Sequence, residues 1–202
     1  MYAGSDALRL DEAASFDFIE RHGFATVVGP DLLATPVPLH LDRAARTLTG
    51  HFARANRHAT TIDGALVLAI FQGPHAYVSP TWLDRRPAVP TWNYGAVHAR
   101  GRARLLDEAQ TLAAVLAVTR QYEPALLDSR DVLTEEYTAQ LLRAVTGFTI
   151  DVEQVEGKLK LGQDKPPQEQ RGVVAGLEAA GRPDTAGLLE LMRATRTGIG
   201  ED

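Results

Sequence analysis

Alternating apolar and polar residues in the first half of the chain predict a series of β-strands. Short apolar runs, bounded by glycine, proline or charged residues, occur at residues 24–28, 32–39, 47–53 and 65–71. Pro36 and Pro38 stand two residues apart, so their missing backbone donors fall on the same side, which is typical of an edge strand. The run at 65–71 is apolar at nearly every position, which indicates a central strand.

The second half of the chain combines further strands with helices. Residues 89–106 are long enough for one bent strand or two, and residues 147–155 are predicted to form a late strand. Helical spacing of apolar residues occurs at 11–22, 108–120, 133–143, 168–180 and 184–193. The last two segments flank Gly181-Arg182-Pro183 and predict a terminal helical hairpin, after which residues 195–202 are expected to be frayed.

The order of these elements predicts the fold class. Strands come first, then a helical insert, a late strand and the terminal helices, without the regular alternation of strand and helix that builds a parallel sheet. We therefore expect a mainly β protein of the α+β kind, an antiparallel barrel with peripheral helices and a C-terminal helical hairpin. The chain is expected to form a single domain over residues 1–202, with residues 157–202 as its helical extension.

Composition narrows the range of partners and compartments. The chain has 202 residues, of which 45% are apolar and 23% charged, as in a typical globular protein. The net charge of -5 argues against binding of nucleic acid by the whole surface. The absence of cysteine excludes disulfides and fits a cytoplasmic location, and the sequence shows neither a signal peptide nor a run long enough to cross a membrane.

The segment from Phe71 to His98 concentrates the candidate binding chemistry. It reads FQGPHAYVSPTWLDRRPAVPTWNYGAVH and contains both tryptophans of the protein. Flat apolar rings beside a few polar groups are suited to a planar, partly polar cofactor. The alternative is that these rings form a core or a dimer interface, which is more common for such clusters. The candidate contacts in this segment are Tyr77, Ser79, Trp82, Thr91, Trp92, Asn93, Tyr94 and His98.

Two cationic segments are candidates for binding phosphate. Arg54-Ala55-Asn56-Arg57-His58 follows a predicted strand and is expected to open a short helix, where backbone donors and an arginine fork suit a phosphate. The segment from Lys158 to Lys165 carries Lys158, Lys160 and Gln163, which could reach a phosphate or the edge of a ring. Each segment has a simpler interpretation, the first as a surface turn and the second as an exposed loop.

A stripe of basic residues follows the strand after Val97. His98, Arg100, Arg102 and Arg104 alternate with small or apolar residues and therefore share one face. Such a face could meet phosphates of DNA or carboxylates of a partner subunit, although a solvated outer face of the barrel is the more usual explanation. No helix-turn-helix pattern accompanies the stripe.

Motifs for other chemistries are missing from the sequence. The histidines show no HExxH or paired metal spacing, and the GxSxG, P-loop and GxGxxG patterns do not occur. We therefore predict no metal site and assign no catalytic residue.

Four motifs of the chain resemble the PaiB-type family of transcriptional regulators, whose domain is an FMN-binding split barrel. They are Gly50–Asn56 (GHFARAN), Ile70–Trp82 (IFQGPHAYVSPTW), Val89–His98 followed by Gly101, and Gly157–Leu161 (GKLKL). The resemblance implies a split β-barrel that binds FMN. The residues that it implies as contacts to FMN are His51, Arg54, Asn56, Tyr77, Ser79, Trp82, Thr91, Trp92, Asn93, Tyr94, His98, Lys158, Lys160 and Gln163.

The sequence departs from the family pattern at two places. Arg57, His58 and Ala59 replace the usual Pro-Gln-Trp, so a ring contact from that tryptophan is lost. Gly162 replaces a serine and Asp164 an asparagine, which removes a hydroxyl and adds a negative charge near the expected phosphate.

Three functions follow from these observations. The first is a regulator that binds FMN and represses transcription, with DNA as a partner. The second is an FMN-dependent oxidoreductase of the pyridoxamine-phosphate-oxidase-like barrel class, in which the cofactor supplies the redox chemistry. The third is a dimer whose aromatic segment is simply its interface. We expect a homodimer in each case, because one small barrel is not expected to bury the aromatic segment alone.

Overall fold

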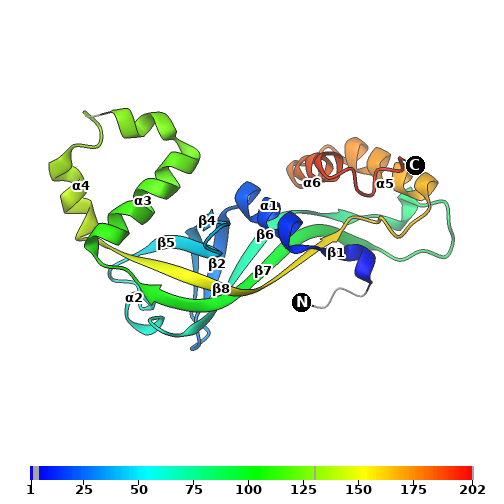
Figure 1. Ribbon diagram of the computed structural model, residues 1–202. Coiled ribbons are helices and arrows are strands. Elements are labelled where there is room, and N and C mark those ends of the chain that lie inside the picture. The colour runs from blue at the N-terminus through cyan, green and yellow to red at the C-terminus, as the bar shows by residue number, and fades with distance from the viewer. Residues whose placement is uncertain (2–4, 130, 202) are drawn as a thin grey trace. The chain divides into compact units, whose positions relative to one another are not determined.

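The computed structural model describes residues 1, 5–129 and 131–201 of a mixed α+β chain (Figure 1). Contacts group the chain into two compact units. Residues 12–71 and 97–155 form what we call the barrel unit, and residues 1–11, 72–96 and 156–202 form the terminal unit. The single-domain organisation stays a prediction.

In chain order the elements are η1 (Asp6–Leu8), β1 (Arg9–Leu10), α1 (Glu12–Arg21), β2 (Phe24–Val28), β3 (Ala34–Pro38), β4 (His40–Asp42), β5 (Thr47–Ala53), α2 (His58–Thr61), β6 (Leu66–Val78), η2 (Pro80–Trp82), β7 (Thr91–Leu105), α3 (Glu108–Tyr122), η3 (Pro124–Asp128), α4 (Glu135–Leu142), β8 (Val145–Lys160), α5 (Pro167–Ala180) and α6 (Pro183–Ala194).

The sheet of the barrel unit curls until its two edges adjoin. Its strand order is β3-β2-β6-β7-β8-β5-β4, so β3 and β4 are the edge strands. They follow each other in the chain with Leu39 as the single residue between them. One residue cannot cross a flat sheet of this width, so the sheet must curl into a barrel. The antiparallel barrel expected from the sequence is confirmed, and the prolines of β3 lie on an edge strand as predicted.

Alternating side chains of these strands fill the barrel. Val27 of β2, Leu48 and Phe52 of β5, and Phe148 of β8 are almost completely buried. The rings of Phe52 and Phe148 stack with their centroids 4.2 Å apart. Because the two residues come from strands paired in antiparallel register, the stacking fixes that register through the core.

A helical insert of α3, η3 and α4 separates β7 from β8. It begins with a capping box, in which the Asp107 carboxylate accepts from Gln110 N at 2.8 Å and the Gln110 side chain accepts from Asp107 N at 3.2 Å. Thr111 on α3 accepts a hydrogen bond from the backbone of Gly147 at 3.2 Å. A Cβ on Gly147 would lie 2.6 Å from that hydroxyl, so glycine lets α3 lie directly against the start of β8.

The terminal unit combines the distal parts of β6, β7 and β8 with β1 and two helices. β1 pairs with β8, with Arg9 opposite Lys158. Helices α5 and α6 form the predicted hairpin, which turns at Gly181 in the left-handed conformation (Figure 1). Trp82 packs against α5, where Gly172 and Gly176 leave room for its backbone and its ring. Gly172 and Gly176 therefore allow η2 to lie close against α5.

The C-terminal segment is ordered, which makes the frayed-tail prediction wrong over residues 195–201; residue 202 lies outside the described residues. Arg171 on α5 donates to the carbonyl of Gly200 at 2.8 Å, and Gly200 N donates to the Gln170 side chain at 2.9 Å. Gly198 and Gly200 both adopt positive φ, so the segment can fold back closely on Leu161 and on α5.

Strand lengths differ most from expectation. β6 extends to Val78 and β8 to Lys160, beyond the predicted 65–71 and 147–155. β1 and β4, with two and three residues, are too short to give a pattern in the sequence. Across the part of the chain that the structure describes, no helix combines the length and apolar character needed to span a bilayer.

Candidate functional site

Lysine and tyrosine side chains meet on adjoining strands of the terminal unit. Lys158, near the end of β8, is only 6% exposed, and its Nζ lies 5.5 Å from the centroid of the Tyr94 ring on β7. Lys160, two residues later on the same strand, donates to the Thr91 hydroxyl and, at 2.9 Å, to the carbonyl of Trp92. The tight turn after β8 brings Gly162 toward Asn93, whose side chain is buried. The structure therefore brings together six of the predicted contacts and adds Gly162.

Electrostatics favour an anion beside these lysines. Burial lowers the pKa of the Lys160 ammonium, and Lys158 acts in the same direction, whereas Tyr94 and Asp164 oppose the shift. A bound anion would favour the charged form of these partly shielded ammonium groups. A phosphate has the charge and the acceptor oxygens to do so.

An aromatic surface lies beside the lysines. The Trp92 residue is 50% exposed, and Tyr77 meets its ring edge-on with 6.2 Å between centroids. His75 lies at the same centroid distance of 6.2 Å from Trp92. Since part of the Trp92 ring remains accessible, it can stack on a planar ligand. Together with the lysines, this donor set fits a planar molecule that carries a phosphate, as FMN does.

Three other predicted contacts in the terminal unit have structural tasks. Ser79 caps η2 by accepting from Thr81 N at 3.2 Å. Gln163 stabilises the turn after β8, because its side-chain amide donates to Leu159 O at 2.7 Å and accepts from Leu161 N at 2.8 Å. The Trp82 ring packs on Gly176 of α5. Their role in binding FMN stays a prediction.

In the barrel unit, Arg54 holds the end of the helical insert. Its Nε donates to the carbonyl of Arg143 at 2.7 Å, and a terminal nitrogen donates to the carbonyl of Val145 at 2.9 Å. These contacts occupy part of the guanidinium fork that was expected to bind phosphate. The phosphate role of Arg54 therefore stays a prediction, and its shown role is to tie β5 to the segment between α4 and β8.

Asn56 and His58 organise the turn after β5. Asn56 donates to the Thr35 hydroxyl at 3.1 Å and accepts from His58 N at 2.9 Å. His58 is fully buried, packs against Phe52 with 5.1 Å between centroids, and bonds to Leu33 O at 3.1 Å. Helix α2 begins at His58 and has four residues, so only a single turn follows the predicted phosphate site.

His51 and His98 are the other predicted contacts in the barrel unit. Both are half-buried. Burial lowers the pKa of His51, whose Nδ1 is buried without a hydrogen-bond partner in the described structure. His98 lies on β7 at the start of the basic stripe.

Acidic residues of β8 neutralise much of the basic stripe. Arg104 makes two hydrogen bonds of 3.0 Å to the carboxylate of Asp151, which lowers the pKa of that carboxylate. Arg102 lies 3.5 Å from a carboxylate oxygen of Glu153, and Arg100 bonds to Gln154 at 3.3 Å. The stripe is therefore a paired outer surface of the sheet rather than an open row of cations.

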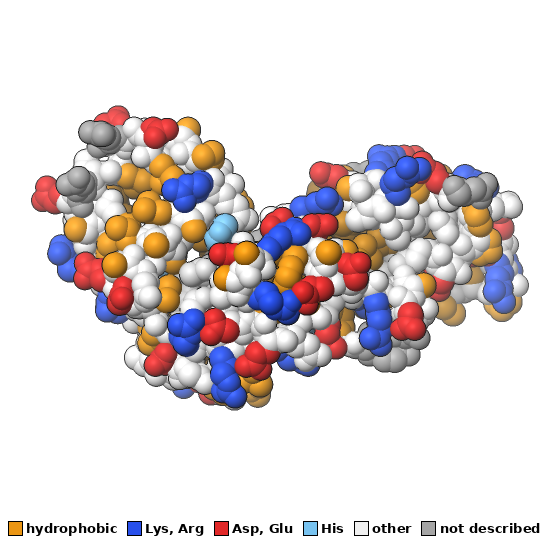
Figure 2. Space-filling model, viewed as in Figure 1, with side chains coloured by type: hydrophobic (Ala, Val, Ile, Leu, Met, Phe, Trp, Pro, Cys, Tyr) orange, Lys and Arg blue, Asp and Glu red, His pale blue; other side chains and the backbone are white. Residues whose placement is uncertain are grey.

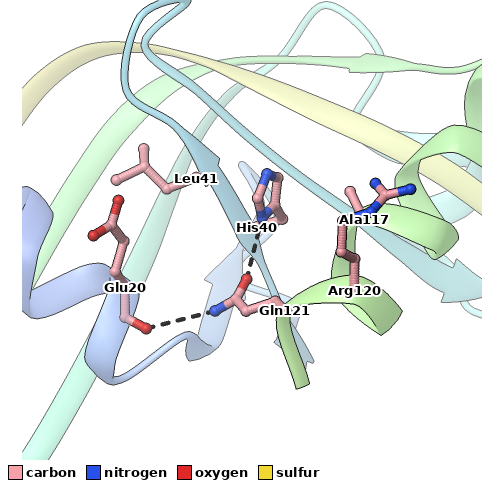
Figure 3. A pocket seen from close by; sticks show the side chains of 6 residues that line it. All are labelled: Glu20, His40, Leu41, Ala117, Arg120 and Gln121. Carbon is pink, nitrogen blue, oxygen red and sulfur yellow. Dashed lines mark hydrogen bonds between the residues drawn. The ribbon is translucent and has the colours of Figure 1, made fainter. Parts of the chain in front are cut away.

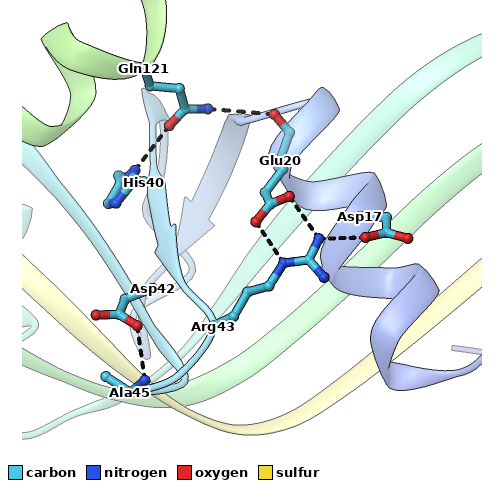
Figure 4. A network of polar contacts seen from close by, with 7 residues as sticks. All are labelled: Asp17, Glu20, His40, Asp42, Arg43, Ala45 and Gln121. Atoms are coloured by element: carbon cyan, nitrogen blue, oxygen red, sulfur yellow. Dashed lines mark hydrogen bonds and ion pairs between the residues drawn. The ribbon is translucent and has the colours of Figure 1, made fainter.

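A pocket of about 380 Å³ in the barrel unit was not predicted from the sequence (Figure 3). Gln121 of α3 spans it, bonding to His40 Nδ1 at 3.2 Å and to the backbone carbonyl of Glu20 at 3.5 Å. The Glu20 carboxylate faces Arg43, which it meets at 2.6 and 2.7 Å (Figure 4). These contacts join α1, β4 and α3, so the pocket is part of the structural framework. Its residues are far apart in the chain and share no motif.

Comparisons with known proteins agree with the fold. Residues 1–154 match the model of the family described as "Putative FMN-binding domain". The chain is 32% identical over 188 residues to the "Protease synthase and sporulation protein PAI 2" of Bacillus subtilis, covering 88% of this chain and 89% of that protein.

Two solved structures share the fold at low sequence identity. The flavocytochrome Anf3 of Azotobacter vinelandii superposes with a TM-score of 0.63 at 16% identity, over 80% of this chain and 77% of that one. The FAD and haem binding protein of Mycobacterium smegmatis gives a TM-score of 0.58 at 16% identity, over 85% and 78%. At this identity the likeness concerns the fold alone.

Proposed function

The chain belongs to the PaiB-type family of FMN-binding-domain proteins, and on that premise we propose that it binds FMN and acts as a transcriptional regulator. The observation that carries the FMN proposal is the pair Lys158 and Lys160 beside the rings of Tyr94 and Trp92. The lysines supply positive charge for the phosphate, and the accessible Trp92 ring supplies a stacking surface for the flavin.

Bound flavin would supply redox chemistry, and the chain's own residues would bind and orient it. The ammonium groups of Lys158 and Lys160 neutralise the phosphate. Tyr77 holds the Trp92 ring edge-on and so limits its rotation. We propose that FMN binds between the subunits of a homodimer, because Trp92 is a large apolar residue that remains half exposed in the single chain and that a partner subunit would cover.

The absorbance spectrum of protein purified without added flavin, followed by titration with FMN, tests the binding proposal. Both tryptophans lie in the terminal unit with the lysines, so saturating FMN is expected to quench tryptophan fluorescence. Neither copurified flavin nor any quenching at saturating FMN would show that the pocket assignment is wrong.

The proposed role in transcriptional regulation requires a separate test, because the basic stripe is paired with acidic residues and offers little free positive charge to DNA. Binding of the FMN-loaded protein to the promoter of its own gene, compared with a shuffled sequence of equal length, measures it directly. We expect sequence-specific retardation. If the two DNAs bind equally weakly while NADH or NADPH reduces the flavin, the oxidoreductase interpretation replaces the regulatory one.

A further inference from the structure

The barrel unit contains a second cavity, of about 630 Å³, whose lining is apolar. The cavity lies between the helical insert and the strands β5 and β8. In Figure 2, apolar side chains surround a hollow in the region of this insert, at the upper left of the view. Leu116 of α3, Leu127 of η3 and Leu142 of α4 are among the residues that line it. The volume falls within the range of about 300–1,000 Å³ that small-molecule sites occupy.

Among the described residues that line the cavity, His51 is the only one with a ring. Its Nδ1 is buried and has no hydrogen-bond partner in the described structure, so a ligand in the cavity would meet the part of the half-buried ring that remains accessible. Burial lowers the pKa of the imidazole, so the ring is uncharged at neutral pH and can donate from one nitrogen and accept at the other. The hydroxyl of Thr119, which also lines the cavity, already donates to Val115 O at 3.0 Å.

The lining argues against FMN as the occupant of this cavity. Among the described residues, neither lysine nor arginine lines it, so a phosphate buried there would have no counter-charge. Its size and composition suit an uncharged ring system with little polar surface.

We propose that this cavity binds a small, largely aromatic molecule that carries a single hydrogen-bonding group, with that group at the His51 imidazole. The proposal concerns a ligand other than FMN and does not rest on the proposed function. It gives the helical insert a role in binding an effector.

The neutral dye N-phenyl-1-naphthylamine, which has two aromatic groups and one N–H donor, serves as the probe. Its fluorescence is expected to rise on saturable one-to-one binding to the full chain, with no displacement by saturating FMN. Displacement by FMN would assign the cavity to the flavin and overturn the proposal. The titration gives a result whether or not FMN binds elsewhere, so the two proposals can fail separately.

A matched pair of ligands isolates the role of His51. 1-Benzylnaphthalene has a methylene group in place of the N–H and is measured by its displacement of the dye. The variant His51→Phe, which keeps a ring of similar size, is expected to weaken the dye about three- to tenfold and to leave 1-benzylnaphthalene unchanged. Equal effects on both ligands, or no effect on either, would contradict the role of the imidazole.

Filling the cavity tests its location. Leu116→Trp and Leu127→Trp each add bulk to a different wall and should abolish dye binding, whereas Leu66→Trp, at a position that is 53% exposed, should not. Binding that survives in a filled variant with a native circular dichroism spectrum would overturn the site. Loss of a dimer in the filled variants, seen by light scattering, would show instead that a second copy occupies the cavity. If both variants fail to fold, the affinities of His51→Phe for the dye and for 1-benzylnaphthalene still test whether the ligand binds at His51.

Discussion

At the scale of single residues, the burial of His58 makes the stability of the protein depend on pH. Burial lowers the pKa of the imidazole below its ordinary value of 6.5, and His51 shifts in the same direction for the same reason. The unfolded chain therefore takes up these protons at a higher pH than the folded chain. The stability that depends on keeping these imidazoles uncharged is fully present above pH 6.5. It is lost as the pH falls from 6.5 through the lowered pKa that burial gives these histidines in the folded protein.

We expect a lower urea midpoint at pH 5.5 than at pH 7.5, and a smaller difference between the two in His58→Phe. The variant keeps a ring against Phe52 and removes the titrating group. The same pH dependence in the variant and the wild type would show that His58 does not carry the effect.

Arg54 gives a prediction about both the fold and the site. Arg54→Ala removes hydrogen bonds to the carbonyls of Leu142, Arg143 and Val145, so we expect a loss of about 1 kcal/mol in the free energy of unfolding. If Arg54 also contacts the phosphate, as its motif predicts, the variant will weaken FMN more than riboflavin, which has the same ring and no phosphate. Titration with both ligands decides this. Equal losses would assign Arg54 to the fold alone.

At the scale of elements, Trp82 and helix α5 depend on a glycine for their contact. A Cβ on Gly176 would lie 2.2 Å from the Trp82 ring, and the ring cannot move away without disturbing η2. Gly176→Ala is therefore expected to destabilise the protein by about 1–3 kcal/mol despite the higher helix propensity of alanine.

Gly187→Ala on α6 is the matched control. Its Cβ would lie 3.6 Å from Pro74, which is an ordinary contact, so we expect no loss or a gain of up to about 1 kcal/mol. Urea unfolding followed by tryptophan fluorescence measures both. A neutral Gly176→Ala would contradict the packing of Trp82 on α5.

Patterns within elements were easier to predict than the contacts between them. The alternation at residues 47–53 predicted β5 with its bounds, and the paired prolines of β3 predicted an edge. The late part of β8 was missed because Glu153 to Lys158 mixes charges into the strand where its apolar alternation stops. The tail was predicted to fray because its anchors, Gln170 and Arg171, lie on another element.

The same holds for the candidate site, where single residues were easier to predict than the contacts between them. The sequence indicated Lys158, Lys160 and Tyr94 as candidates, but only the pairing of strands shows that they meet. The sequence left open whether the stripe from Arg100 to Arg104 meets DNA, a partner subunit or solvent, whereas the structure shows that the neighbouring strand supplies Asp151 and Glu153. The cavity beside His51 has no sequence signature, because its walls are ordinary amphipathic helices.

At the scale of the whole molecule, we expect a homodimer. Exposed apolar rings such as Trp92 are costly for a monomer, and a second subunit would cover them. Light scattering at low micromolar concentration is expected to give twice the chain mass of 21.9 kDa. A strict monomer, with and without FMN, would exclude both the dimer and a flavin bound between subunits.

The central claim is that the lysine pair of the terminal unit holds the phosphate of FMN. Its most direct test is the ratio of FMN to riboflavin affinity in the wild type and in Lys158→Met, which keeps the length of the side chain and removes its charge. We predict about a ten- to hundred-fold loss of affinity for FMN, little change for riboflavin, and no change for either ligand in the control Arg102→Ala on the outer stripe. An unchanged FMN-to-riboflavin ratio in Lys158→Met would contradict the account.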